Sequence, residues 1–187
     1  FEEDCRILEN WQAHVIMLPL SVNTSALQLQ DTMMVSHLQN LHSELKINPG
    51  SFVLELTETA KIDDTERAME LLRPIEKTGV SVVLDDFGMG YSNLHYLHQF
   101  RSLPVRRLKL DRSFVAGLPA DDTMVRIVGS IADIMQLDVI AEGVETTEQR
   151  DWLLARGIHI AQGYLYSPAL SEQVFNEQWL VAPVSEI

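Results

Sequence analysis

The sequence predicts an α/β fold of the (β/α)₈ TIM-like barrel type, with about six of the eight strands of that fold in this chain. Short apolar runs recur without alternating polar residues, which is typical of parallel strands buried on both faces. Amphipathic stretches separate most of these runs, as crossovers between parallel strands require. An open doubly wound sheet also fits this alternation, but no dinucleotide or P-loop motif follows the first run.

The apolar runs give six predicted strands. They are Val15–Val22, Phe52–Leu56, Val80–Leu84, Arg107–Leu110, Val139–Ala141 and Ile158–Ala161. The third run is the most informative, because it is rich in β-branched residues and stops at Asp85 and Asp86 before a glycine-rich loop. Two carboxylates at the end of a buried strand stay ionised where cations or strong hydrogen bonds compensate them, which indicates a divalent-metal site.

The stretches between the runs predict helices with one apolar side. They are Leu27–Leu45, Thr65–Lys77, Asp121–Gln136, Thr146–Arg156 and Ser171–Leu180. Several begin at residues that favour helix N-termini, such as Asp122, Thr146 and Ser171. Pro74 lies inside the second of these stretches, where its missing N–H predicts a kink or a break.

Composition predicts one domain over residues 1–187, with a net charge of −13 and 46% hydrophobic residues. An acidic chain binds nucleic acid and anionic membrane poorly, so we expect no DNA, RNA or membrane contact from this segment. The single cysteine, Cys5, forms no internal disulfide, which favours a cytoplasmic location. The chain starts at Phe1 and not at methionine, so an upstream membrane anchor or sensor stays open.

Polar side chains lie at or just beyond the end of every predicted strand, where barrel enzymes build their active sites. They are Asn23, Glu55 and Glu58, Asp85 and Asp86, Lys109 and Asp111, Glu142 and Glu145, and Gln162. Their oxygen atoms are hard donors that suit Mg²⁺, Mn²⁺ or Ca²⁺, and an adjacent aspartate pair can bridge two ions, as in phosphodiester hydrolysis. Lys109 could orient the attacking water or form a salt bridge to one of the acids.

The segments around these residues carry a family resemblance. They are Ser21–Ser25, Phe52–Glu58 (FVLELTE), Leu84–Ser92 (LDDFGMGYS), Leu108–Phe114 (LKLDRSF), Ala141–Thr146 (AEGVET) and Gln162–Leu165 (QGYL). In this order, from about Trp11 to Leu170, they resemble the EAL-domain family of cyclic di-GMP phosphodiesterases. The resemblance implies a modified TIM barrel that cuts cyclic di-GMP (c-di-GMP) to linear pGpG with two Mg²⁺ or Mn²⁺ ions, Ca²⁺ being inhibitory.

The resemblance also implies roles for single residues. The metal ligands would be Asn23, Glu55, Asp85 and Asp86. Lys109 would contact the catalytic water, Glu142 would act at the second metal as base, and Glu58 would brace the loop after Asp86. Substrate contacts are assigned to Gln162, Asp111 and Glu145. A homodimer through the loop and helix after Asp86 is the assembly that the resemblance suggests.

Two departures from the family pattern keep alternatives open. The Glu-Ala-Leu signature, with its metal-binding glutamate, is absent from these 187 residues, and Met89 and Asn93 stand where threonine and serine are usual. We therefore expect a phosphodiesterase in the full-length parent and an inactive fragment. The alternatives are a non-catalytic c-di-GMP receptor, a degenerate protein-interaction module, or a barrel enzyme acting on another phosphodiester or sugar phosphate.

Overall fold

The computed structural model describes residues 2–13, 18–25, 28, 32–40, 47–57, 65–88 and 104–180. Its strands form one parallel sheet of six strands in the order β1-β2-β3-β4-β5-β6. They are β1 (Leu20–Thr24), β2 (Phe52–Thr57), β3 (Ser81–Phe87), β4 (Arg107–Leu110), β5 (Asp138–Ala141) and β6 (Ile160–Ala161). Spatial order that follows chain order is that of a barrel, whereas a doubly wound sheet reverses its order at a switch point. The predicted barrel-type α/β fold is confirmed.

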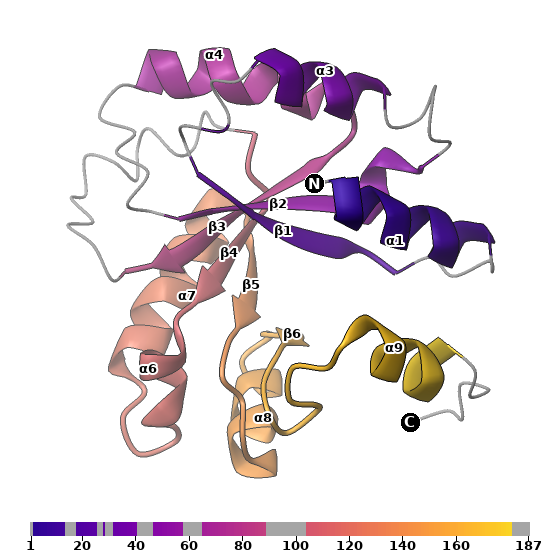
Figure 1. Ribbon diagram of the computed structural model, residues 1–187. Coiled ribbons are helices and arrows are strands. Elements are labelled where there is room, and N and C mark those ends of the chain that lie inside the picture. The colour runs from indigo at the N-terminus through magenta and orange to yellow at the C-terminus, as the bar shows by residue number, and fades with distance from the viewer. Residues whose placement is uncertain are drawn as a thin grey trace.

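Helices cover the outside of this curled sheet (Figure 1). The described helices are α1 (Glu2–Ala13), α3 (Thr32–Asn40), η1 (Pro49–Ser51), α4 (Thr65–Glu76), α6 (Arg112–Ala116), α7 (Thr123–Met135), α8 (Thr147–Leu154), α9 (Glu172–Phe175) and η2 (Asn176–Leu180). Figure 1 shows α3 and α4 at one end of the fan of strands, and α6, α7 and α8 at the other. In the described part of the chain, no helix combines the length and apolarity needed to cross a bilayer.

Helices α1 and α9 lie together although they are distant in sequence. The ring of Trp11 in α1 stacks on Phe175 of α9 with 5.3 Å between centroids. The indole N–H of Trp11 donates to Asn176 Oδ1 at 3.1 Å, and Arg6 pairs with Glu172. These contacts tie the N-terminal helix to the end of the described chain, on the side of the sheet away from α6 and α7 (Figure 1).

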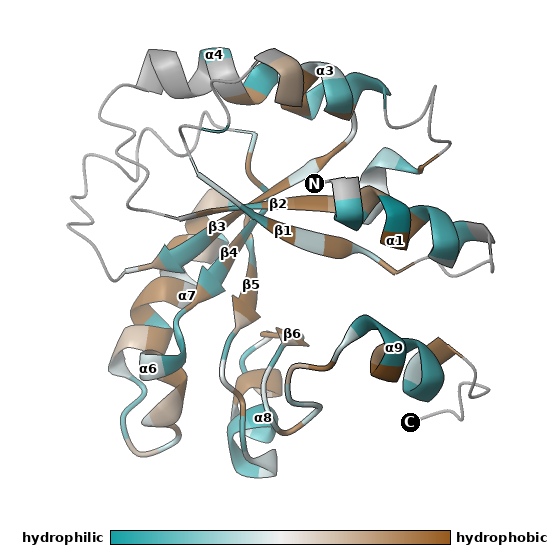
Figure 2. Ribbon diagram, viewed as in Figure 1, coloured by the Kyte–Doolittle hydropathy of each residue, from teal (hydrophilic) through white to brown (hydrophobic). Residues whose placement is uncertain are grey.

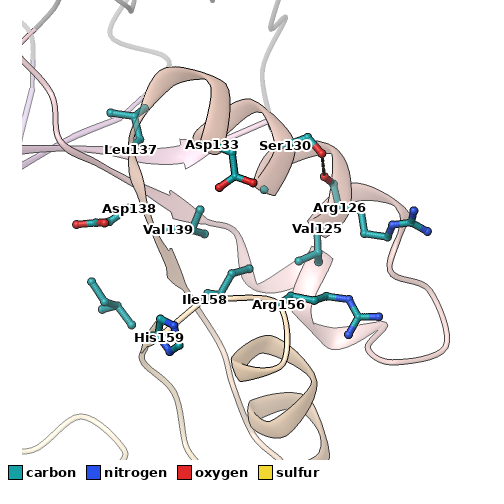
Figure 3. A pocket seen from close by; sticks show the side chains of 13 residues that line it. Val125, Arg126, Ser130, Asp133, Leu137, Asp138, Val139, Arg156, Ile158 and His159 are labelled. Carbon is teal, nitrogen blue, oxygen red and sulfur yellow. Dashed lines mark hydrogen bonds between the residues drawn. The ribbon is translucent and has the colours of Figure 1, made fainter.

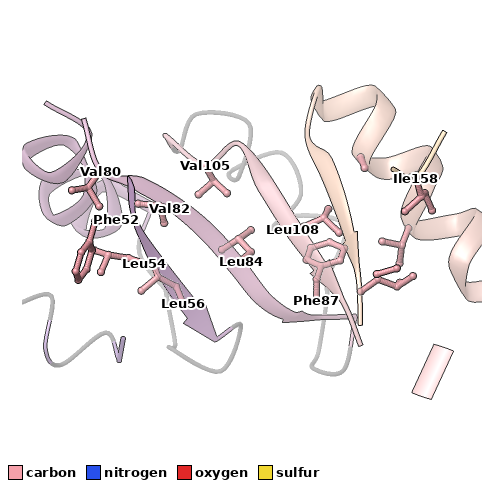
Figure 4. Close-up of a cluster of buried hydrophobic side chains, with 14 of the residues drawn as sticks. Phe52, Leu54, Leu56, Val80, Val82, Leu84, Phe87, Val105, Leu108 and Ile158 are labelled. Atoms are coloured by element: carbon pink, nitrogen blue, oxygen red, sulfur yellow. The ribbon is translucent and has the colours of Figure 1, made fainter. Parts of the chain in front are cut away.

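The two faces of the central strands have different chemistry because neighbouring residues point to opposite sides. On one face, Phe52, Leu54 and Leu56 of β2 are almost fully buried in the main apolar cluster (Figure 4). The hydropathy colouring shows apolar residues along β2 and hydrophilic ones toward the ends of β3 and β4 (Figure 2). The other face of β2 carries Val53 and Glu55, which are also buried but lie outside that cluster. The helices therefore pack on one face and leave the other for the functional side chains.

The structure corrects several predicted boundaries. β3 runs on to Phe87, so Asp85 and Asp86 are strand residues and not the start of a loop. β1 begins at Leu20, directly after Pro19, because proline has no N–H for the sheet. The break predicted at Pro74 is wrong: α4 continues to Glu76, since Pro74 lies in its last turn, where few hydrogen bonds are lost.

Helices α1 and α6 had no counterpart in the prediction. Helix α6 has only 5 residues and begins at an Asp111 cap, where the carboxylate accepts from the N–H of Ser113. One turn of helix leaves no periodic pattern to detect. The predicted strand residues 15–17 and the ends of the predicted helix Leu27–Leu45 lie outside the described residues.

Two glycines allow the loops after β4, β5 and β6 to pack closely. A Cβ on Gly143, which has a φ of +67°, would lie 2.5 Å from the Cβ of Arg112 in α6. A Cβ on Gly163 would lie 2.3 Å from the backbone nitrogen and oxygen of Val144. Val144 also exchanges backbone hydrogen bonds with the β6 loop, donating to Gln162 and accepting from Leu165. The three loops therefore form one packed rim.

Replacing Gly163→Ala is expected to lower the free energy of unfolding by about 1–3 kcal/mol or more, because the added methyl group meets backbone atoms that cannot rotate away. Urea denaturation followed by circular dichroism measures this. The matched control is Gly129→Ala in α7, where no atom lies within 4 Å of the new Cβ and alanine should stabilise the helix by roughly 1 kcal/mol. Equal stabilities of the two variants would contradict the packed rim.

Candidate active site

Strand register brings predicted site residues of β1, β2 and β3 to one face of the sheet. Asn23 of β1 lies directly opposite Glu55 of β2. Glu55 lies opposite Val83 of β3, and Asp85 follows two residues later on the same face. The side chain of Glu55 is 11% exposed and that of Asp85 is 12% exposed. Asn23 is more exposed, at the β1 edge of the described sheet.

The neighbouring strands add a cation, a third carboxylate and an amide to this face. Lys109 of β4 lies opposite Ile140 of β5, and Glu142 follows Ile140 by two residues. In the same way Gln162 follows Ile160 of β6 by two residues. Because the strands are parallel, all these side chains lie toward the carboxyl ends of their strands.

Lys109 is the centre of the arrangement. Its Nζ lies 2.6 Å from Glu142 Oε1, 2.7 Å from Glu55 Oε2 and 3.2 Å from Asp85 Oδ1. The Lys109 side chain is 7% exposed, so these ion pairs are shielded from solvent. Gln162 Nε2 donates to Glu142 Oε1 at 2.8 Å and extends the cluster to β6. The structure thus brings together Glu55, Asp85, Lys109, Glu142 and Gln162, as the sequence predicted.

The cluster holds more negative than positive charge, and the pKa values of Lys109 and Glu142 reflect this. Burial alone would lower the pKa of Lys109, but hydrogen bonds to Glu142 and Glu55 and the charges of both carboxylates raise it above its ordinary value. The pKa of Glu142 is also raised, because burial and the charges of Asp85 and Glu55 outweigh its hydrogen bond and attraction to Lys109. One ammonium therefore does not compensate three carboxylates.

Asp86 has a backbone conformation that is rare outside glycine. Its φ is +56°, and its N–H donates to the Oδ1 of the preceding Asp85 at 2.9 Å. The pairing of β3 with β4 shifts register between Leu84 and Phe87, around the same two aspartates. Bulges and strained residues of this kind re-aim side chains next to functional sites. Here the irregularity fixes the carboxylate of Asp85 beside Lys109.

Other predicted residues have different surroundings. Asp111 caps α6. Burial raises the pKa of its carboxyl group, but hydrogen bonds with Ser113 outweigh burial and lower that pKa. Glu145 is exposed, and its backbone N–H donates to the side chain of Gln149. A substrate role for Asp111 and Glu145 therefore stays a prediction. Glu58, Met89 and Asn93 lie outside the described residues.

Gln149 is a buried polar residue that the sequence-based prediction did not include. Gln149 is 7% exposed and completes a capping box with Thr146 at the start of α8. The Thr-x-x-Gln spacing from Thr146 to Gln149 is a recognisable signal for this motif.

The donor chemistry of the site suits a hard divalent cation, because Asn23, Glu55 and Asp85 offer amide and carboxylate oxygens from adjacent strands. Among the described residues, no three Asp, Glu, His or Cys side chains form a metal-binding group by themselves. The ammonium of Lys109 lies where the three carboxylates converge. Metal ligands would therefore come from carboxylate oxygens together with the amide of Asn23.

A separate groove of about 450 Å³ lies at the opposite ends of the strands (Figure 3). Its lining includes Asp138 and Ile160, which begin β5 and β6, together with Val125 and Asp133 of α7. Glu142 and Gln162 of the cluster instead follow the carboxyl ends of those strands. The groove is therefore distinct from the candidate active site.

Replacing Lys109→Met is expected to lower the free energy of unfolding by about 3–5 kcal/mol at neutral pH, because the buried Glu55 and Asp85 and the half-buried Glu142 lose their shared counter-charge. Chemical denaturation in the presence of a chelator measures the loss. The matched control is Arg107→Met on the same strand, whose ion pair with Asp138 is exposed and 3.6 Å long, and which should change stability by less than about 0.5 kcal/mol. Equal free energies of unfolding for Lys109→Met and Arg107→Met would contradict the ion pairs of Lys109 with the carboxylates.

The raised pKa of Glu142 predicts a pH dependence of stability. A folded-state pKa above the unfolded value of 4.5 means that the native state holds the Glu142 proton more tightly. This contribution is complete below pH 4.5 and is lost as pH rises through the folded-state pKa. The free energy of unfolding, measured without divalent ions, should therefore fall more steeply with pH in the wild type than in Glu142→Gln. A steeper fall in the variant would contradict the direction of the shift.

Sequence comparison places the chain in a known family. The EAL domain profile matches residues 1–169. Cyclic di-GMP phosphodiesterase PdeR of Escherichia coli K12 is 34% identical over 177 residues, which cover 93% of this chain and 26% of PdeR. Cyclic di-GMP phosphodiesterase PdeL of the same organism is 37% identical over 145 residues, which cover 76% of this chain and 39% of PdeL. The chain thus spans less than half the length of these relatives.

Solved structures agree with this relationship. The EAL domain of Mycobacterium smegmatis DcpA matches with a TM-score of 0.84 and 35% identity, over 94% of this chain and 79% of that one. The manganese/cy-diGMP complex of Klebsiella pneumoniae BlrP1 matches with a TM-score of 0.73 and 27% identity, over 88% of this chain and 42% of that one. With a curled parallel sheet, acidic residues at its strand ends and a matching profile over most of its length, this chain belongs to the EAL domain family.

Proposed function

We propose that this chain is part of a cyclic di-GMP phosphodiesterase domain that hydrolyses c-di-GMP to linear pGpG with two divalent metal ions. The observation that supports this most is the convergence of Glu55, Asp85 and Glu142 on Lys109 at the carboxyl ends of four neighbouring strands. Relatives named as c-di-GMP phosphodiesterases support the substrate class, and the BlrP1 complexes with manganese or calcium support divalent ions.

The reaction adds one water molecule across one phosphodiester bond. The water oxygen bonds to a phosphorus atom of the cyclic dinucleotide, and the bond from that phosphorus to the ribose 3′ oxygen breaks. One water proton leaves to a base and the 3′ oxygen takes up a proton, so the product has one 5′ phosphate and one free 3′ hydroxyl.

Metal binding is assigned to residues of three adjacent strands. Asn23, Glu55, Asp85 and Asp86 would hold two Mg²⁺ or Mn²⁺ ions through their side-chain oxygens. When bound, such ions lower the pKa of water and neutralise charge on the phosphate. Calcium, which takes more ligands in looser geometry, is expected to permit binding and inhibit turnover.

The remaining residues act on the water and the phosphate. Glu142 is assigned as the base that takes the water proton, and Lys109, 2.6 Å from it, would donate hydrogen bonds to the water and to the charged phosphate. Gln162 donates to the carboxylate of Glu142 and so orients it. Substrate contacts by Gln162, Asp111 and Glu145, and bracing of the loop after Asp86 by Glu58, complete the proposal.

A c-di-GMP receptor without turnover is the second candidate. It is favoured by the absence of a Glu-Ala-Leu signature from this sequence, since loss of one ligand beside a metal pair weakens catalysis more readily than binding. We therefore propose catalysis for the full-length protein and inactivity for the chain by itself. A homodimer through the segment after Asp86, most of which lies outside the described residues, and a cytoplasmic location complete the proposal.

The test combines binding and turnover. Calorimetry should detect c-di-GMP binding to this chain in Ca²⁺, and the full-length protein should release pGpG in Mg²⁺ or Mn²⁺, as seen by chromatography. Asp85→Asn should lower kcat of the full-length protein by more than about 100-fold, because it removes a charged ligand and a partner of Lys109.

The matched control is Asp138→Asn, an exposed aspartate at the start of β5, at the opposite end of this strand from Glu142. It should leave kcat within about twofold. Binding without turnover in the full-length protein would select the receptor. If the full-length protein shows no binding of c-di-GMP and no turnover, the proposed function is wrong.

A further inference from the structure

The loop between β5 and α8 carries Glu142, and one buried side chain holds this loop in place. Gln149 is 7% exposed. Its Oε1 accepts the backbone N–H groups of Glu145 at 2.9 Å and Thr146 at 3.1 Å. Its backbone N–H donates to Thr146 Oγ1 at 3.2 Å. These three bonds cap α8, and of the Gln149 side chain they use only the oxygen atom.

The amide nitrogen of the same side chain makes a bond that capping does not need. Gln149 Nε2 donates to the backbone oxygen of Val115 at 3.2 Å. A glutamate at this position also completes a capping box, so the cap by itself does not require an NH₂ group. The extra donor reaches from α8 to α6, 34 residues earlier in the chain.

This bond connects the two segments that hold the central ion pair. Val115 lies in α6, which directly follows the strand that carries Lys109, and Gln149 directly follows the loop that carries Glu142. The same two segments touch again where Gly143 packs on Arg112, and where the N–H of Glu142 donates to the Leu110 oxygen at 3.1 Å. The position of Glu142 relative to Lys109 therefore depends on how these segments are joined.

We propose that Gln149 is a positioning residue for the active site: its amide ties the loop after β5 to α6 and so sets the carboxylate of Glu142 against the ammonium of Lys109. The Val115 oxygen also accepts the backbone N–H of Leu118 at 3.1 Å, so the bond from Gln149 is not needed to satisfy this oxygen and serves to join the loop to α6. Its importance for turnover rests on the proposed function, whereas its effect on the Lys109–Glu142 pair does not.

The test is a double-mutant cycle that measures the coupling between Lys109 and Glu142 by denaturation, using Lys109→Met and Glu142→Gln. The cycle is run in the wild-type, Q149E and Q149M backgrounds. Q149E keeps the two acceptor bonds that cap α8 and loses the bond to Val115. Q149M loses the two acceptor bonds and the bond to Val115, and it adds no charge. We expect the coupling, expressed as a ratio of folding constants, to fall at least about fivefold in both backgrounds.

The control background is Q173M, an exposed glutamine of α9 that bonds only locally to Glu177 at 2.9 Å, and it should leave the coupling unchanged. An unchanged coupling in a folded Q149E protein would overturn the proposal, since Gln149 would then be only a helix cap. A Q149E protein that does not fold would also overturn it, because the bond to Val115 would then hold the fold and not the site.

A second readout separates this inference from the proposed function. If the full-length protein hydrolyses c-di-GMP, Q149E should lower kcat about 10-fold with little change in KM, as is usual when a residue that orients a reacting group is altered. If the full-length protein does not hydrolyse c-di-GMP, the proposed function fails. The double-mutant cycle of Lys109 and Glu142 still decides the role of Gln149.

Discussion

The ammonium of Lys109 among two buried carboxylates and one half-buried carboxylate is the interaction on which the site depends. With all groups ionised, three carboxylates and one ammonium leave two negative charges uncompensated in a largely solvent-shielded place. A sheet can tolerate such an excess only if further positive charge arrives or a carboxyl group becomes neutral. The raised pKa of Glu142 favours a neutral carboxyl group, and binding of divalent cations would supply the positive charge.

The strand order makes this cluster possible. In a parallel sheet whose spatial order follows chain order, the ends of successive strands lie side by side. One residue from each of β2, β3 and β4 then reaches a common point, although Glu55 and Lys109 are 54 positions apart. The apolar residues that alternate with them, such as Leu54 and Leu108, face the helices and supply the packing that holds the strands.

The rim around the cluster is built by close backbone contact. Gly163 packs against the backbone of Val144, and Gly143 packs against Arg112, so neither position has room for a side chain. Asp86 adopts a left-handed conformation that turns its N–H toward Asp85. Because the backbone is constrained at these positions, each loop fixes the position of the loop packed against it. A preorganised site requires loops that are fixed in this way.

The sequence by itself determined the strands, the barrel-type order of elements and five members of the cluster. This was possible because apolar runs that end in acidic, basic or amide side chains report both a buried strand and its functional end. The family motifs then identified c-di-GMP as the ligand of the relatives. Short-range patterns also contained the cap at Thr146 and Gln149, although the glutamine was overlooked.

Only the tertiary structure decided which of these side chains meet. Lys109 could have oriented a water or paired with one acid, and in the fold it contacts three, because register and burial act over distances that no local pattern encodes. The extension of β3 through Asp86 and the bond from Gln149 to Val115 have the same origin. Residue type and spacing specified the parts of the site, and the crossing of chain segments far apart in sequence decided their arrangement.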